Sequence, residues 1–129
     1  MHKRTAYTLR TVLIMFLFAA VGNADQIYEL AYSDSDDSWL ARSVGSEANA
    51  VPAIGSAMTS TTYDGDPRIY YVGDDNMIQE LAYSGGNWLA RSVGSEAKAV
   101  PAIGSAMTST TYDGDPRIYY FGIPKEIKG

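Results

Sequence analysis

The stretch WLARSVGSEANAVPAIGSAMTSTTYDGDPRIYY occupies residues 39–71, and it returns at residues 88–120 with a single change, Asn49 to Lys98. The two copies are offset by 49 residues. A near-perfect repeat with a period of this length is typical of architectures in which each copy folds as one unit and stacks against the next. The repeat therefore decides how the rest of the chain is interpreted.

The repeat extends upstream of this stretch. Residues 27–32 (IYELAY) match residues 78–83 (IQELAY), and the loop that follows is two residues longer in the first copy. Differences in length belong in surface loops, because a loop tolerates insertion better than a packed strand does. One full repeat is therefore a chain of regular elements joined by variable connections.

Each repeat contains four strand-like runs, which in one period fall at residues 56–63, 68–72, 77–83 and 88–93. The breaks between them are rich in Gly, Asp, Asn and Pro, which favour turns because they tolerate positive φ, fix φ or bond their own backbone. No segment shows a convincing helical period. The sequence thus predicts an all-β fold of β-propeller blades, with two four-stranded repeats per chain.

Two blades are too few for a propeller, which usually has four to eight. The chain begins with the third and fourth strands of a blade, residues 27–44, and ends with the first and second, residues 105–121. Joining the last pair of one protomer to the first pair of the next would remove both exposed sheet edges. We therefore expect a homotrimer that forms a six-bladed ring. A fragment of a longer propeller is the alternative.

The first 24 residues differ in composition from the rest. Residues 1–10 carry three basic side chains and no acidic one, residues 11–21 are mostly apolar, and small residues stand at positions 22 and 24. This is the pattern of a secretory signal peptide. A membrane anchor is the competing interpretation, but a spanning helix needs roughly 20 apolar residues. We predict a signal peptide at 1–24 and a secreted domain of two repeats at 25–129.

Charge and composition exclude several function classes. Residues 25–129 carry all 15 acidic side chains and seven of the ten basic ones, for a net charge of −8. Such a surface repels phosphate backbones and anionic lipid headgroups, so we expect neither a nucleic acid nor a membrane as partner. The chain has no Cys, and its one His is His2. A Ser-His-Asp site, a Cys-His site or a usual zinc shell is therefore excluded from the mature chain, and we expect no cofactor and no metal.

Four motifs together resemble the blade of the fungal fucose-specific lectins: GS at 55–56, RIYY at 68–71, IQE at 78–80 and the following Trp88. The resemblance covers nearly all of the chain between the signal peptide and Gly122. It implies a six-bladed propeller that holds fucose between adjacent blades, as in similar two-repeat bacterial lectins that trimerise. In that family the Arg and Glu come from one blade and the aromatic residues from its neighbour.

Carried onto this chain, the resemblance implies two classes of sugar site. The first class comprises Arg68, Glu80, Trp39 and Tyr32, and the second comprises Arg117, Glu29, Trp88 and Tyr83. Glu29 precedes Arg117 by most of the chain, so the second class forms across a chain boundary. A sugar needs a donor fork, a charged acceptor and an aromatic plane for its C–H face, which Arg, Glu and Trp supply. The sequence predicts a non-enzymatic lectin for L-fucose or fucosylated glycans.

Other interpretations stay open at this point. The Arg and Glu side chains could be cross-strand ion pairs, and the Trp residues could pack one blade against the next. A propeller glycosidase could use paired carboxylates drawn from Glu29, Glu47, Glu80 and Glu96. Against it, these acids recur identically in both repeats, whereas catalysis needs two carboxylates in different environments. A structural or protein-binding propeller is the remaining class, and a glycan array would separate it from a lectin.

Overall fold

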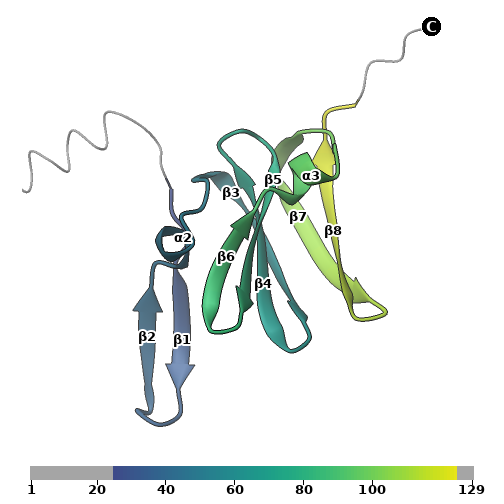
Figure 1. Cartoon of the computed structure of the whole chain (residues 1–129). Helices are drawn as coiled ribbons and strands as arrows, with labels where there is room; N and C mark the ends of the chain where they lie inside the picture. The colour runs from purple at the N-terminus through teal and green to yellow at the C-terminus, as the bar shows by residue number, and fades with distance from the viewer. Residues whose placement is uncertain (1–24, 125–129) are drawn as a thin grey trace, which may run out of the picture.

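The computed structural model describes residues 25–124, and this part of the chain is all-β. Antiparallel strands form three curled sheets that stand side by side (Figure 1). The strands are β1 (Glu29–Ser33), β2 (Ser38–Arg42), β3 (Ala53–Tyr63), β4 (Asp66–Gly73), β5 (Ile78–Ser84), β6 (Asn87–Arg91), β7 (Ala102–Tyr112) and β8 (Asp115–Gly122). The predicted signal peptide lies outside the described residues. No helix within residues 25–124 has the length and apolar character needed to span a membrane.

The three sheets differ in their number of strands. The middle sheet has four strands in the order β3-β4-β5-β6, while β1-β2 and β7-β8 are separate two-stranded sheets. In sequence, β1 and β2 match β5 and β6, and β7 and β8 match β3 and β4. Each small sheet therefore corresponds to one half of the middle sheet. The prediction of four strands per repeat is confirmed for β3 to β6, which form one complete repeat.

The predicted turns form where the sequence places them. Between β3 and β4 the chain reverses at Asp64 and Gly65, which have φ of 55° and 83°. Positive φ at both central residues defines the hairpin turn whose twist matches that of the flanking strands, and Asp-Gly is a preferred pair for it. Gly85 and Gly86 turn β5 into β6 in the same way, with φ of 58° and 86°.

Two one-turn helices were not predicted. Helix α2 (Val44–Glu47) follows β2, and α3 (Val93–Glu96) follows β6, where the sequence had suggested that the strand continues to residue 93. A Cβ atom added to Gly94 would lie 2.8 Å from the backbone nitrogen of Ile78, so α3 packs directly against the start of β5. Four residues are too few to show a helical period, which is why the pattern gave no signal.

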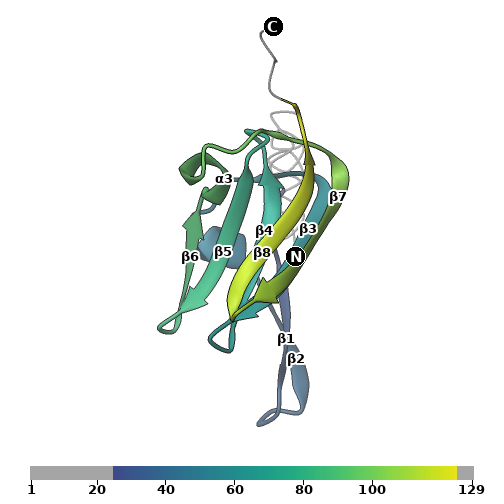
Figure 2. The ribbon, with the colours of Figure 1, turned by 90° about the vertical axis from the view of Figure 1, so that its right-hand side faces the viewer.

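The middle sheet is covered on both faces. On one face Tyr71, Leu81 and Trp88 pack with Ile27 and Val44, which come from the segments flanking the β1-β2 sheet. The opposite face packs against the β7-β8 sheet through a second cluster, whose buried members are Ala57, Tyr70, Val72, Ile78 and Ala102. Figure 2 shows β7 and β8 lying in front of the middle sheet. The β7-β8 sheet is therefore stacked on one face of the middle sheet, and segments that flank the β1-β2 sheet cover the other.

The first strands of neighbouring sheets, β3 and β7, meet through small polar side chains. The hydroxyl oxygens of Thr59 and Ser109 are 2.7 Å apart, and Ser109 also donates a hydrogen bond of 2.8 Å to the carbonyl oxygen of Ser60. Small side chains allow the two strands to approach closely. The sheets therefore come together along β3 and β7 and can diverge towards their outer strands.

We expect Leu81→Ala to lower the free energy of unfolding by about 2–5 kcal/mol, because Leu81 is fully buried in the middle sheet and its loss leaves a cavity. Leu40→Ala makes the same change at a half-exposed position and should cost much less. Urea denaturation of both variants measures the difference. Equal losses would contradict this description of the core.

Candidate functional site

Arg68 and Glu80 line the same cavity, which has a volume of about 380 Å³. Because Arg68 pairs with Ala82, and Tyr70 with Glu80, in the β4-β5 ladder, the side chains of both site residues project from one face of the middle sheet. The other residues that line the cavity are Tyr63, Ala82, Ser84, Leu89, Arg91 and Pro116. Pro116 belongs to β8, so the cavity lies between the middle sheet and its neighbour.

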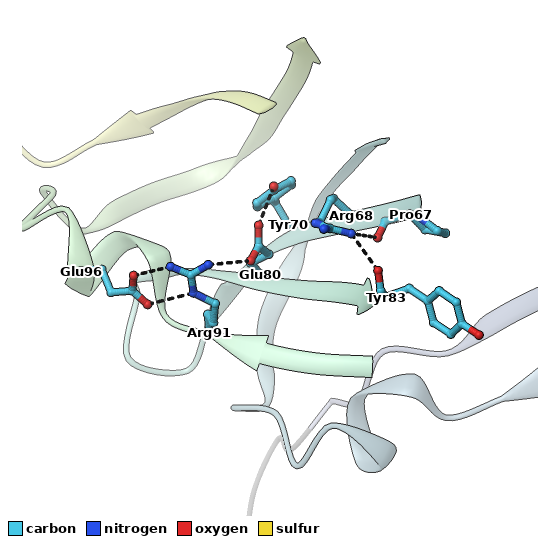
Figure 3. A network of polar contacts seen from close by, with 7 residues as sticks. All are labelled: Pro67, Arg68, Tyr70, Glu80, Tyr83, Arg91 and Glu96. Atoms are coloured by element: carbon cyan, nitrogen blue, oxygen red, sulfur yellow. Dashed lines mark hydrogen bonds and ion pairs between the residues drawn. The ribbon is translucent and has the colours of Figure 1, made fainter. Parts of the chain in front are cut away.

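Glu80 is 8% exposed and is held by a tyrosine (Figure 3). The hydroxyl of Tyr70 donates a hydrogen bond of 2.8 Å to Oε2 of Glu80. Burial, followed by the hydrogen bond to Glu80, raises the pKa of Tyr70, so its phenol stays protonated and remains a donor near neutral pH. This bond occupies one carboxylate oxygen and leaves Oε1 to accept from another group.

Arg68 is fixed in place by groups other than Glu80. Its Nη1 donates to the carbonyl oxygens of Tyr83 and Pro67 at 2.9 and 3.1 Å, and its guanidinium lies 5.2 Å from the centre of the Tyr63 ring. These contacts orient the guanidinium plane and use one of its three nitrogens. Within residues 25–124 the hydrogen bonds of Arg68 come from Nη1 alone, so Nε and Nη2 are available as donors.

The cross-strand ion pair that the sequence left open does not form here. Within the described part of the chain, no ion pair joins Arg68 to Glu80, and the cation nearest to Glu80 is Arg91, whose Nη1 lies 3.9 Å from Oε1. The donor and the acceptor thus face one cavity without neutralising each other. Such an arrangement is able to receive a polar ligand between them.

Sequence reasoning missed Arg91. It lies opposite Glu80 in the β5-β6 ladder, and Glu96 of α3 binds it through two hydrogen bonds of 3.2 and 2.6 Å (Figure 3). The bonds to Arg91 hold the pKa of the Glu96 carboxyl below its usual range. The hairpin turn at Gly85 and Gly86 determines this register, so the Glu80–Arg91 pairing could have been read from the turn.

The two predicted Trp residues differ in their surroundings. Trp88 is 6% exposed and belongs to the core cluster on the face opposite Glu80, while Trp39 is 67% exposed on β2. Each Trp contacts a predicted Tyr edge to face, with ring centres 5.6 Å apart for Tyr32 and Trp39 and 5.4 Å apart for Tyr83 and Trp88. The structure does not place Trp39 or Tyr32 at the Arg68 cavity of the same chain.

Nor are the second Arg and Glu brought together within one chain. Arg117 lies on β8 and Glu29 on β1, at opposite sides of the molecule (Figure 1). The guanidinium of Arg117 lies 4.8 Å from the centre of the Tyr112 ring, which repeats the arrangement of Arg68 over Tyr63. A hollow of about 240 Å³ adjoins Arg117, lined by residues of β7 and β8. The arginine and tyrosine of the first site are therefore reproduced around Arg117, but, within the described residues, the glutamate is not.

Within residues 25–124, no group of three or more His, Cys, Asp or Glu side chains is arranged to hold a metal ion. Comparison with known protein families, with curated proteins and with solved structures finds no match for the chain. What the cavity is able to bind must therefore be argued from its own residues.

We expect Tyr70→Phe to lower the free energy of unfolding by about 1.5–3 kcal/mol, because it removes a hydrogen bond to a buried charged group. Tyr112→Phe removes the same hydroxyl from an exposed position and should change stability by less than about 0.5 kcal/mol. Thermal and urea denaturation measure both. A Tyr70→Phe protein as stable as the wild type would show that Glu80 does not depend on this bond.

Proposed function

We propose that the chain is a secreted, non-enzymatic lectin that binds L-fucose or fucosylated glycans between neighbouring sheets. The observation that carries the proposal is the cavity in which Arg68 and Glu80 face the same space without pairing. Sugar hydroxyls both donate and accept, so they match the free nitrogens of an arginine and the free oxygen of a carboxylate. The resemblance to fucose-specific lectins favours fucose, and the composition of residues 1–24 favours secretion.

The cavity supports binding better than glycoside hydrolysis. Hydrolysis requires two carboxyl groups roughly 5 to 10 Å apart on either side of the scissile bond. Glu80 is the one acidic residue that lines the cavity. Glu96, the acid on the far side of Arg91, is bound to that arginine through both of its oxygens. A single buried carboxylate held by a tyrosine suits an acceptor of hydrogen bonds.

The aromatic ring that lines the cavity, Tyr63, lies against the guanidinium of Arg68, and we propose that a second copy supplies the aromatic plane for the sugar. Sheet β7-β8 covers the inner half of the middle sheet, where Pro116 reaches the cavity. Two further strands beside β8 would extend the β7-β8 sheet over Glu80. The strands that match these in sequence are β1 and β2, whose exposed face carries Tyr32 and Trp39. Placed next to β8, this pair from another copy turns Trp39 towards Arg68 and Glu80.

Differences in burial between equivalent residues support this assembly. Leu81 is 0% exposed and its counterpart Leu30 is 71% exposed, while Tyr70 is 2% exposed and its counterpart Tyr119 is 56% exposed. The Trp residues differ in the same way. Each small sheet therefore exposes apolar side chains whose counterparts in the middle sheet are buried. Exposed apolar surface of this kind is typical of an interface.

The strand edges indicate how the copies would join. In the middle sheet β4 pairs with β5, so that Tyr70 lies opposite Glu80. In the described residues β8 pairs with β7 alone and β1 with β2 alone, which leaves the outer edge of β8 and the outer edge of β1 unpaired. Pairing β8 with β1 of another copy in the same register places Tyr119 opposite Glu29 and brings Arg117 beside it. The second class of site would then be completed.

Joined in this way, each pair of small sheets becomes one four-stranded sheet, which we interpret as a propeller blade. Three copies would contribute three whole blades and three composite ones, giving a six-bladed ring within the usual range of four to eight. A homotrimer with cyclic symmetry uses the same contact at each interface and pairs every β8 edge with a β1 edge. Several sites on one ring would also raise the avidity for branched glycans.

We expect the protein starting at Asp25 to sediment at about three times its monomer mass. Phe121→Asp should yield a monomer, because it places a charge on the exposed face of β8, where its counterpart Val72 is buried. Ile103→Asp is the control: Ile103 and its counterpart Ile54 are similarly exposed, so the trimer should persist. A wild-type protein that is a folded monomer at every concentration would reject the assembly.

We expect Arg68→Ala to halve the number of fucose sites per chain in calorimetry and to leave the class built on Arg117 working. The double variant Arg68→Ala, Arg117→Ala should lose binding and keep its oligomeric state. Loss of one charge-assisted contact corresponds to roughly a hundredfold loss of affinity, which calorimetry resolves even for a weak ligand. Fucose binding of unchanged affinity in the double variant would show that these arginines do not contact the sugar.

A further inference from the structure

The two oxygens of Glu80 have different surroundings. Oε2 accepts the hydrogen bond from Tyr70, whereas Oε1 lies 3.9 Å from Nη1 of Arg91. This separation is too long for a direct hydrogen bond between an amino group and an oxygen. An oxygen atom placed beside both groups can lie about 2.8 Å from each, and polar groups separated in this way are commonly bridged by a third group.

Two of the three guanidinium nitrogens of Arg91 bind Glu96, and the third, Nη1, does not. Its Nε and Nη2 bind the two oxygens of Glu96, a bidentate arrangement that fixes the plane of the guanidinium. Its Nη1 points at Glu80, as Figure 3 shows, and Arg91 lines the cavity. Glu96 therefore positions Arg91 in the same way that Tyr70 positions Glu80. Each of the two groups that flank the 3.9 Å gap is thus held by hydrogen bonds to another side chain before a ligand binds.

We infer that Arg91 is a ligand-contacting, specificity-determining residue of this cavity, and that one sugar hydroxyl binds between Oε1 of Glu80 and Nη1 of Arg91. The hydroxyl donates its proton to Glu80 and accepts a hydrogen bond from Arg91. This inference rests on the proposed function and extends it, since the family resemblance assigns no role to Arg91. A sugar that carries a hydrogen atom in place of this hydroxyl makes no hydrogen bond to Glu80 or to Arg91. A site built from polar groups rejects an analogue in this way.

The test is designed so that one class of site is measured alone. In the background of Arg117→Ala, the sites that remain are those built on Arg68 and Glu80. There Arg91→Gln should lower the affinity for methyl α-L-fucoside by roughly ten- to a hundredfold in calorimetry, because a charge-assisted contact is lost. Lys98→Gln removes a positive charge from an exposed position away from the cavity and should leave the affinity unchanged.

Sugar analogues distinguish a ligand contact from a general effect on the fold. We expect one of the three methyl fucosides that lack the 2-, 3- or 4-hydroxyl to bind the background protein at least as weakly as methyl α-L-fucoside binds its Arg91→Gln form, because the missing hydroxyl contacts both Glu80 and Arg91. For that analogue, Arg91→Gln should cause no further loss, because its contact is already missing. If Arg91 acted only on structure, the substitution would weaken the parent sugar and all three analogues by the same factor.

Three outcomes would overturn the inference, and they differ in what they leave standing. Unchanged affinity in Arg91→Gln rejects the hydroxyl site and leaves the lectin proposal intact. An equal loss for the parent sugar and every analogue also rejects it, since Arg91 would then touch no single hydroxyl. If the wild-type protein binds none of a panel of monosaccharides, the proposed function fails, and the inference fails with it.

Discussion

The structure depends on one constraint: the middle sheet is apolar on both faces and must be covered on both. Leu81 and Tyr71 project from one face, and Tyr70 and Val72 from the other, and all four are buried. Hydrophobic burial of this kind is the main source of stability in a chain that has no disulfide. It explains why the β7-β8 sheet covers one face of the middle sheet and why the segments that flank the β1-β2 sheet cover the other. It also explains why the outer faces of these two sheets, which have the same sequence pattern, remain exposed.

The same packing creates the polar site. Glu80 lies among the residues that face the β7-β8 sheet, and a buried carboxylate is costly unless its oxygens are satisfied. Tyr70 satisfies one oxygen from within the sheet, and Arg91 stands too far away to satisfy the other directly. The fold therefore leaves Oε1 of Glu80 open to the cavity, without a hydrogen bond from the described part of the chain. This is the feature that makes the cavity a candidate for binding hydroxyl groups.

Ion pairs contribute to the site mainly by fixing geometry. The pairs Arg42–Glu47 and Arg91–Glu96 are exposed, and exposed pairs contribute little to stability. Both occur at the same point of the repeat, where a strand passes into a one-turn helix. The helix places the acid five residues after the arginine and so aims the remaining nitrogen across the sheet. Short helices that sequence patterns could not reveal therefore have a direct effect on the site.

The sequence by itself determined the strands, the turns and the pairing of residues within each hairpin, because these depend on local chemistry such as Asp64 and Gly65 at a tight turn. It also placed Arg68 and Glu80 on neighbouring strands. Only the tertiary structure decided that Trp88 is buried and Trp39 exposed, although both begin the same WLARSVGSEA segment. Burial depends on which sheet stands opposite a side chain, and nothing in a local sequence records that neighbour.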